Sequence, residues 1–401
     1  MNLLYTLTSY PPSTGGAQTL AHQLACQMMQ HHAVQVVSHW DSSRTDWLMG
    51  TTLNAPSTPR DYAVDGVPVH RMGFGWAERL QMAALTPFYY PFMAAGLPSV
   101  AQGFAQVIER HLAPFAARAD LIHNTRIGRE GLSLASFKVA RQRGVPFVLT
   151  PVHHPRWVGW RYRDYLRLYQ QADALIALTA AEKQILLGLG VRDERVFVSG
   201  MGPTLAATAN AAQFRQRFAI AGPMVLFLGQ HYPYKGYKQL LQAAALVWQR
   251  VSEAEFVFIG PQHGEAAQVL AAHADRRIHA LGAVDVQTKT DGLAACDLLC
   301  VPSTQESFGG IYTEAWHFAK PVIGCPIPAV AEVISEGEDG YLVAQQPAEI
   351  AERVCDLLLN PTRAAEMGRR GQLKTAANFT WARIAERTQT AYNFAIGLAR
   401  Q

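Results

Sequence analysis

The sequence predicts an α/β protein made of two doubly wound domains that face a central cleft. The chain has 401 residues, which is too long for one small core and fits two such domains. Hydrophobic residues make up 49% of the chain and charged residues 16%, which indicates a globular protein and not a disordered one. Short apolar runs alternate with helical patterns from end to end, as in parallel sheets joined by crossover helices.

The first domain is expected to span residues 1–203 and to end at the break Gly200-Met-Gly-Pro203. Its expected strands are short apolar runs, and its expected helices have apolar residues at helical spacing. The strands are residues 2–8, 34–38, 121–123, 146–150, 174–178 and 195–199, and the helices are residues 18–30, 129–143 and 180–187.

The second domain is expected to span residues 204–380, and the alternation restarts in it at Pro223. Its strands are predicted at residues 223–228, 255–259, 278–281, 297–301, 321–324 and 340–343, and its helices at 237–251, 264–274, 348–359 and 362–377. A last helix, residues 381–398, has a strong apolar stripe, and we expect the segment 381–401 to pack back on the first domain.

Three features of the sequence indicate where the protein is located and which partners it can bind. They are its charge, its cysteine content and the lack of a leader pattern. The net charge is +4 with a pI near 8.8, which suits an anionic ligand or a membrane surface without demanding nucleic acid. The five cysteines are scattered, and we expect reduced, mostly buried thiols. The start of the chain reads as a first strand, and no apolar run is long enough to span a bilayer. We therefore expect a cytoplasmic protein.

The most informative segment lies in the second domain, between Glu306 and Glu314. It follows a short apolar run that reads as a buried strand, and it contains Ser307-Phe-Gly-Gly310 before a helical pattern that begins near Ile311. This places one acid in a loop and one in the expected first turn of a helix. Helix N–H groups attract an anion, and two carboxylates accept hydrogen bonds from hydroxyl groups. The segment therefore favours a ligand that is both anionic and rich in hydroxyls, such as a sugar nucleotide.

These motifs together resemble glycosyltransferase family 4, whose GT-B architecture has two Rossmann-like domains. The segment from Glu306 to Ala315 is followed by Ala319-Lys-Pro-Val-Ile-Gly324 and Gly337-Glu-Asp-Gly-Tyr-Leu-Val343. Lys235-Gly236, Gly15-Gly16 and Phe379-Thr-Trp381 also fit. Each motif is weak by itself, whereas their order and spacing over nearly the whole chain are specific.

The resemblance implies a retaining transfer of a sugar from a nucleotide-diphosphate donor to a sugar, lipid-linked or small-molecule acceptor. It assigns Glu306 to the hydroxyls of the donor sugar and Glu314 to the ribose diol. It places the backbone of Ser307, Phe308, Gly309, Gly310 and Ile311 against the sugar and phosphates. It assigns Lys235 to the diphosphate, where a lysine supplies a compact cation as leaving-group charge develops. The alternatives for Glu306 and Lys235 are a solvated loop acid and a surface lysine in a turn.

The chain departs from the family pattern directly after the first strand of the second domain. The family usually has an arginine there, whereas this chain has Gly229 followed by Gln230 and His231. One cation for the diphosphate is therefore missing. His231, Lys238 or an arginine of the first domain are the candidates to replace it, and a slow or inactive enzyme is the alternative.

Two further site candidates lie in the first domain. Gly15 and Gly16 sit between the first strand and the first helix, where they either form a tight turn or let the backbone approach a phosphate. His153 and His154 follow the strand at residues 146–150, whose carboxyl end should face the cleft. The family often places a histidine there, near the donor sugar and the acceptor, and the spacing does not distinguish the two.

Residues 156–169 mix cations with aromatic side chains. From Arg126 to Arg167 the chain has nine basic and two acidic residues. This segment suits an acceptor sugar, a lipid phosphate or peripheral contact with the inner face of a membrane, and an ordinary solvated helix is the alternative.

We expect neither a metal nor a cofactor. The chain has no Asp-x-Asp, the clustered carboxylates by which a metal usually holds a donor diphosphate. The nucleotide-diphosphate sugar would be a substrate. Two other functions stay open, namely a catalytically silent sugar-nucleotide-binding protein or partner subunit, and a GT-B-shaped sugar-nucleotide epimerase.

Overall fold

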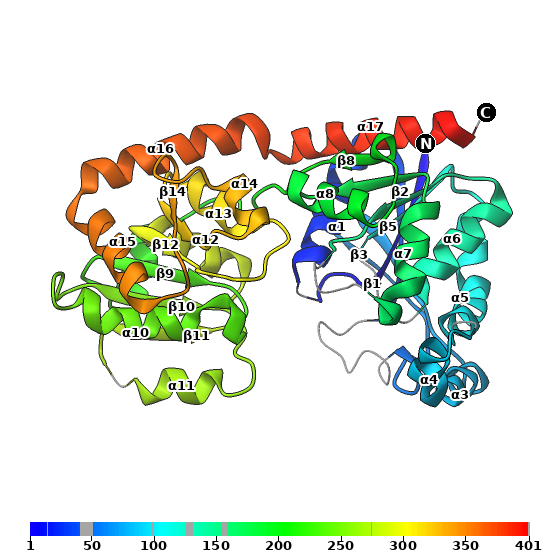
Figure 1. Cartoon of the computed structure of the whole chain (residues 1–401), viewed down its shortest axis with the longest axis horizontal. Helices are drawn as coiled ribbons and strands as arrows, with labels where there is room; N and C mark the ends of the chain where they lie inside the picture. Colours follow the sequence, from blue (N-terminus) through cyan, green and yellow to red (C-terminus); the bar gives the residue numbers. More distant parts are fainter. Residues whose placement is uncertain are drawn as a thin grey trace. The chain divides into compact units, whose positions relative to one another are not determined.

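The computed structural model describes residues 1–13, 15–40, 51–97, 100–125, 131–153, 159–273 and 275–399. These residues form two compact α/β units, 1–200 together with 381–401, and 201–380 (Figure 1). The expected boundary lies three residues further along the chain, after residue 203. Residues 201–206 belong to the second unit because they contact it: the backbone N–H of Ala206, for example, donates to Thr290 Oγ1 at 2.9 Å.

The first unit is built on a sheet that has eight strands within the described residues, in the order β3-β4-β2-β1-β5-β6-β7-β8. Every neighbouring pair is parallel except the hairpin of β3 and β4, which the sequence patterns do not predict. The strands are β1 (Asn2–Ser9), β2 (Ala33–Trp40), β3 (Arg60–Val64), β4 (Val67–Arg71), β5 (Leu121–Thr125), β6 (Phe147–Thr150), β7 (Ala174–Ala177) and β8 (Val196–Val198).

Helices cover both faces of this sheet, as a doubly wound fold requires. Strand β1 shows the two cores, because Leu4 packs in one apolar cluster while Leu3 and Tyr5 pack in the other. The helices are α1 (Gly16–Met28), α3 (Trp76–Leu85), α4 (Tyr89–Ala94), α5 (Val100–Ala116), α6 (Leu132–Arg143), α7 (Arg163–Gln171) and α8 (Ala180–Gly188), with 3₁₀ turns η1 (Thr86–Phe88), η2 (Trp160–Tyr162) and η3 (Asp193–Arg195).

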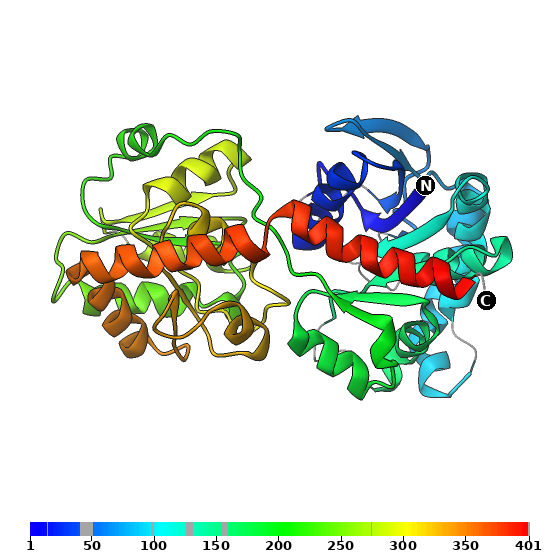
Figure 2. The ribbon, with the colours of Figure 1, turned by 90° about the horizontal axis from the view of Figure 1, so that it is seen from above.

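The last helix, α17 (Trp381–Ala399), belongs to the first unit and lies along its sheet (Figure 2). Its Tyr392 is fully buried, and the hydroxyl is 2.7 Å from both Tyr5 Oη and His123 Nδ1. His123 Nε2 is in turn 2.8 Å from Thr150 Oγ1. Burial lowers the pKa of His123 to about 3, so the ring is neutral and this chain of hydrogen bonds carries no charge.

The second unit contains a parallel sheet with six strands in the described range 201–380, in the order β11-β10-β9-β12-β13-β14. The strands are β9 (Met224–Leu228), β10 (Glu255–Ile259), β11 (Ile278–Gly282), β12 (Leu298–Cys300), β13 (Val322–Gly324) and β14 (Gly340–Leu342). The helices are α9 (Ala211–Arg217), α10 (Tyr237–Val247), α11 (Ala266–Ala272), α12 (Val286–Ala295), α13 (Gly310–His317), α14 (Pro328–Val333), α15 (Pro347–Leu359) and α16 (Pro361–Asn378), with the 3₁₀ turn η4 (Pro233–Lys235).

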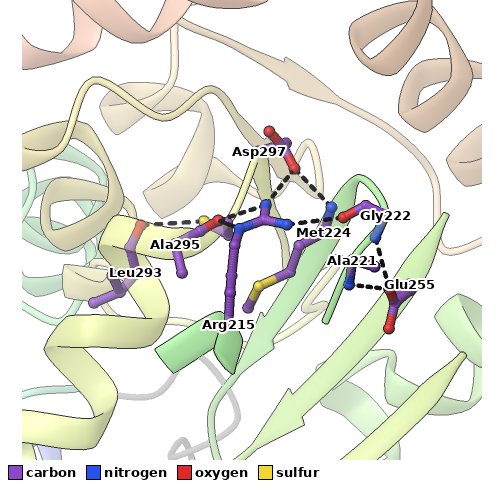
Figure 3. A network of polar contacts seen from close by, with 9 residues as sticks. Arg215, Ala221, Gly222, Met224, Glu255, Leu293, Ala295 and Asp297 are labelled. Atoms are coloured by element: carbon purple, nitrogen blue, oxygen red, sulfur yellow. Dashed lines mark hydrogen bonds and ion pairs between the residues drawn. The ribbon is translucent and has the colours of Figure 1, made fainter. Parts of the chain in front are cut away.

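A polar network fixes the amino ends of β9, β10 and β12 (Figure 3). The guanidinium of Arg215 donates to the carbonyls of Ala295 and Gly222 and to Asp297 Oδ2, at 2.8 to 3.1 Å. Asp297 Oδ2 also accepts from the backbone N–H of Met224 at 2.7 Å. These bonds tie the start of the first strand of this sheet to the start of its neighbour.

Both sheets reverse their strand order beside their first strand. Strand β1 lies between β2 and β5, and β9 lies between β10 and β12. In open α/β sheets such switch points, at the carboxyl ends of the strands, are where ligands bind. The segments that follow β1, β6, β9 and β12 contain the residues predicted for the site.

Candidate functional site

The loop between β12 and α13 brings backbone close to a helix N-terminus. Gly309 has φ +88°, and a Cβ there would lie 2.4 Å from the ring of Tyr312, so only glycine fits. Helix α13 starts at Gly310, and no side chain caps its first turn. Phe308 is buried with its ring edge against Phe379, whereas Gly310 is half-buried. The helix therefore offers its N-terminal N–H groups to an anion.

Lys235 and Glu306 meet directly at the carboxyl ends of β9 and β12. Lys235 ends turn η4, and its Nζ lies 2.5 Å from Glu306 Oε1. Their side chains are 18% and 12% exposed. Gly236, which follows, has φ +83°, and a Cβ there would lie 2.7 Å from the carbonyl oxygen of Pro302. The sequence predicted both charged residues as site members, and the fold places them in contact.

Glu314 makes a second ion pair on α13. Its Oε1 lies 2.8 Å from Lys289 Nζ and accepts from the backbone N–H of Thr204 at 3.3 Å. The side chains of Glu314 and Lys289 are 10% and 19% exposed. The expectation that Glu314 lies in the first turn is wrong: α13 begins at Gly310, so Glu314 is its fifth residue and no acid occupies the first turn. The carboxylate is held by Lys289 instead of by the helix terminus.

Lys289 is not among the predicted site residues, because no helix was predicted at α12. The signal was present in Asp285, whose side chain accepts from the backbone N–H of Thr288 at 2.6 Å and caps the helix. A helix starting there places Lys289 one turn later. Its Nζ also donates to the carbonyl of Thr204 at 2.6 Å, so it links α12, α13 and the start of the unit.

The other predicted members of this segment are Ser307 and Ile311. Both are half-buried and flank the glycine pair at the start of α13. Every site residue predicted for the second unit therefore lies on the turns that follow β9 and β12 or in helix α13.

The two glycines of the first unit have different surroundings. Gly15 precedes α1 in an extended conformation, and a Cβ there would lie 2.3 Å from Gln18 Oε1. Gln18 is buried and its Nε2 donates to Ser9 Oγ at 2.8 Å, so it has little room to yield. At Gly16 a Cβ would meet nothing within 4 Å. Local packing thus explains Gly15, whereas Gly16 faces open space at the start of a thirteen-residue helix.

His153 is buried and held from two sides after strand β6. Its ring Nδ1 lies 3.0 Å from Tyr169 Oη on α7, and its backbone N–H donates to Glu182 Oε1 at 2.6 Å. Glu182 Oε2 accepts from the backbone N–H of Leu178 at 2.7 Å. Val152 has φ +49°, a strained conformation for a β-branched residue. Burial raises the pKa of Glu182 to about 7, although the two N–H bonds oppose the shift.

The second predicted histidine, His154, lies outside the described residues, as do residues 155–158. The site described for the first unit therefore does not include His154.

A group with metal-ligand chemistry occurs elsewhere in the first unit. In the part of the chain that the structure describes, His22, Cys26 and Asp65 offer ligand atoms within 4.8 Å of one another. His22 Nε2 lies 2.9 Å from Asp65 Oδ2, and His22 Nδ1 lies 2.8 Å from Tyr10 Oη. These contacts join α1 to the turn between β3 and β4, and none of the three residues is among those predicted for the site.

Comparison with known proteins identifies both halves of the chain. Residues 15–202 match the model of the "Glycosyl transferase 4-like domain", and residues 222–360 match that of "Glycosyl transferases group 1". The chain is 31% identical over 243 residues to D-inositol 3-phosphate glycosyltransferase 2 of Catenulispora acidiphila, covering 56% of this chain and 57% of that protein. It is 35% identical over 137 residues to phosphatidyl-myo-inositol mannosyltransferase of Mycobacterium tuberculosis, covering 32% and 35% of the two chains. The match thus spans about half, or less, of these relatives.

A solved structure shows the same fold over the whole chain. Anabaena HepE in complex with UDP and glucose superposes with a TM-score of 0.75 at 19% identity, covering 98% of this chain and 99% of that one. This confirms the predicted α/β fold with two Rossmann-like units. The two family models lie side by side along the chain and together take in both units. The chain belongs to glycosyltransferase family 4.

Proposed function

We propose that this protein is a retaining glycosyltransferase that moves a sugar from a nucleotide-diphosphate donor to an acceptor. The observation that supports this most strongly is the contact of Lys235 with Glu306 beside the uncapped start of α13. Two lysines, two carboxylates and a helix N-terminus without a side-chain cap match a ligand that carries both phosphates and hydroxyls. The names of the relatives, with sugar transfer to inositol derivatives, agree with this class of reaction.

In this proposal each residue has one task. Lys235 neutralises the diphosphate as the leaving group gains charge. Glu306 accepts bonds from the hydroxyls of the donor sugar, and Glu314 accepts bonds from the ribose diol. His153 or His154 is the candidate to contact the donor sugar or the acceptor. A bound donor offers Lys235 and Glu306 new partners, so the ion pair between them is the contact that binding must loosen. Lys235 and α13 provide the neutralising groups, and donor binding needs no metal.

The silent sugar-nucleotide-binding protein is the second candidate, and Gln230 is the observation that favours it. A neutral amide at that position stabilises less charge on a leaving diphosphate than an arginine would. The protein would then bind a sugar nucleotide without cleaving it to free nucleotide.

A two-step experiment separates these functions. First, a thermal-shift panel of UDP, GDP, ADP and dTDP, each with and without its sugar, identifies the donor, because a ligand of the folded state raises the melting temperature. Second, release of free nucleotide from that donor is measured without an acceptor. Slow release supports the transferase, whereas binding without release supports the silent protein. No shift with any nucleotide would refute both.

We also propose contact with an anionic membrane surface through the basic, aromatic segment 156–169. In its described part Trp160 is 47% exposed, and the Arg161 guanidinium lies 5.2 Å from the Trp160 ring and 5.8 Å from that of Tyr90. Aromatic side chains beside cations suit a lipid headgroup region. No described helix has the length and apolar character to cross a bilayer. Co-flotation with vesicles rich in phosphatidylglycerol, compared with neutral vesicles and with Trp160→Ala, tests this; equal flotation in all three would contradict it.

A further inference from the structure

Gln230 and His263 meet at the carboxyl ends of two neighbouring strands of the second unit. Gln230 follows β9 and His263 follows β10, and the two strands are parallel neighbours. The pairing continues past the strands, because His231 bridges to Gln262 and its backbone N–H donates to the carbonyl of Pro261 at 2.9 Å. The two loops are therefore held together beside turn η4, which ends in Lys235.

The contact between the two side chains has a defined direction. His263 Nε2 lies 3.1 Å from Gln230 Oε1. A side-chain amide oxygen only accepts hydrogen bonds, so Nε2 carries the proton and donates it. With its oxygen engaged in this way, the amide of Gln230 turns its two N–H donors away from His263.

A row of stacked rings fixes the plane of His263 and leads back to Lys235. The His263 ring stacks on Tyr232 at 4.5 Å between centroids, with 17° between the planes. Tyr232 stacks on Tyr234 at 5.4 Å and 10°, and Lys235 Nζ lies 5.7 Å from the centroid of the Tyr234 ring. The orientation of the Gln230 amide is thus coupled to the same turn that presents the predicted diphosphate cation.

The two candidates that the sequence offered as replacement cations in this unit have other roles. His231 is fully buried among the rings of Phe227 and Tyr237, and burial lowers its pKa, so the ring is neutral. Lys238 forms an ion pair with Glu265. Burial therefore argues against His231 as the replacement cation, whereas Lys238 and an arginine of the first domain stay candidates beside Gln230.

We propose that Gln230, oriented by His263, is a ligand of the donor diphosphate next to Lys235. Its amide N–H groups donate to a phosphate oxygen, and His263 is a positioning residue that acts through Gln230. This rests on the proposed function, because it assigns a residue to the diphosphate of the same donor. Gln230 is a neutral hydrogen-bond donor where a second cation would otherwise stand. The affinity of this site for the diphosphate should therefore depend less on salt concentration.

Calorimetric titration tests the proposal with the tightest-binding nucleoside diphosphate among UDP, GDP, ADP and dTDP, and with the matching nucleoside. Gln230→Ala and His263→Ala should each raise the Kd for the diphosphate about fivefold, the value of one hydrogen bond, and leave the nucleoside unaffected. The double variant should be no weaker than Gln230→Ala. His263→Gln, whose amide can donate to Gln230, should restore most of the affinity. His273→Ala, at the exposed end of α11, is the matched control.

A gain-of-affinity variant makes the test independent of lost stability. Gln230→Arg should bind the diphosphate about tenfold more tightly and with a steeper salt dependence, since an arginine contributes a charge-assisted bond. In that background His263→Ala should have no effect. Unchanged diphosphate affinity in Gln230→Ala and His263→Ala, with weaker binding in Lys235→Ala, would overturn this inference and leave the proposed function intact. If the unaltered protein binds none of the four nucleotides, both are refuted.

Discussion

The two edges of the second sheet use charged side chains in opposite ways. At the amino ends of the strands, Arg215 and Asp297 bond to backbone carbonyl and N–H groups (Figure 3). Glu255 accepts there from two backbone N–H groups at 2.7 Å, and His279 Nε2 lies 2.6 Å from its second oxygen. At the carboxyl ends, Lys235 pairs with the side chain of Glu306. Lys289 pairs with Glu314, and this second pair also bonds to the backbone of Thr204.

The difference separates groups that hold the fold from groups that can serve a ligand. A backbone partner cannot leave without unfolding a strand, so the amino-edge charges have fixed partners. A side-chain partner can rotate and share its hydrogen bonds with a ligand. We therefore expect variants at the amino edge to lose stability and variants at the carboxyl edge to lose binding or turnover.

The largest effect is expected for Glu306→Ala. Removing an acceptor from the reacting sugar should lower the rate of nucleotide release about a thousandfold, roughly 4 kcal/mol, and change donor affinity less. The measurement is turnover and Kd with the same donor. Unchanged turnover would remove Glu306 from the site. It would also contradict the view that charged residues at the carboxyl edge serve a ligand.

Glu182 in the first unit extends the comparison to a buried carboxylate with two backbone partners. Its pKa is raised from 4.5 to about 7, so the neutral form is favoured in the folded state. The associated stability is fully present below about pH 4.5 and is lost as the pH rises through 7. This change is up to about 3 kcal/mol across the window.

Urea unfolding of the unaltered protein and of Glu182→Gln through this pH range measures the effect. The unaltered protein should lose stability relative to Glu182→Gln as the pH rises through 7, because the variant cannot ionise at this position. Glu194→Gln, an exposed control, should follow the unaltered protein. A constant difference for Glu182→Gln would contradict the raised pKa.

Arg215→Ala should lower the free energy of unfolding by about 2.5 kcal/mol, because it removes the guanidinium bonds to Asp297 and to the carbonyls of Gly222 and Ala295. Urea unfolding measures this loss. Donor affinity, measured where the variant is still folded, should not change. A variant that is fully stable but binds donor poorly would reverse the assignment of the two edges.

Lys235→Ala should weaken nucleoside-diphosphate binding by about 2 kcal/mol, roughly thirtyfold, since a charge-assisted bond is lost. Titration calorimetry reads this directly. Lys183→Ala is the control, because this lysine pairs with Asp193 at 2.8 Å and is not among the candidates for the diphosphate. The assignment of Lys235 fails if both variants bind equally well.

Much of the fold could be predicted from apolar periodicity. The predicted strand at 223–228 is β9 (Met224–Leu228), and the predicted helix at 381–398 is α17 (Trp381–Ala399), because buried parallel strands and amphipathic helices have strong patterns. The hairpin of β3 and β4 escaped prediction because its edge strand β3 has no buried residue, and β4 has only the two buried valines Val67 and Val69. The predicted helices also omit α3, α4, α5, α9, α12 and α14, of which α3 and α12 begin with side-chain capping signals at Glu78 and Asp285.

The site could be predicted only as a set of positions. Glu306, Glu314 and Lys235 followed from motif order, whereas Lys289 came from an unpredicted helix. The placement of Glu314 in a first turn was wrong, because α13 already begins at Gly310. Burial argues against His231 as a cation, and burial is a tertiary property that the local sequence does not contain.

The sequence by itself determined the fold class, the family and which residues could bind phosphates and hydroxyls, since these depend on local pattern and side-chain chemistry. Only the tertiary structure decided which charges are partners. Lys235 and Glu306 lie 71 positions apart, as Gln230 and His263 lie 33 apart, and they meet because parallel strands bring their carboxyl ends to one edge. Distance in space and burial, which govern charge and hydrogen bonding, arise from packing.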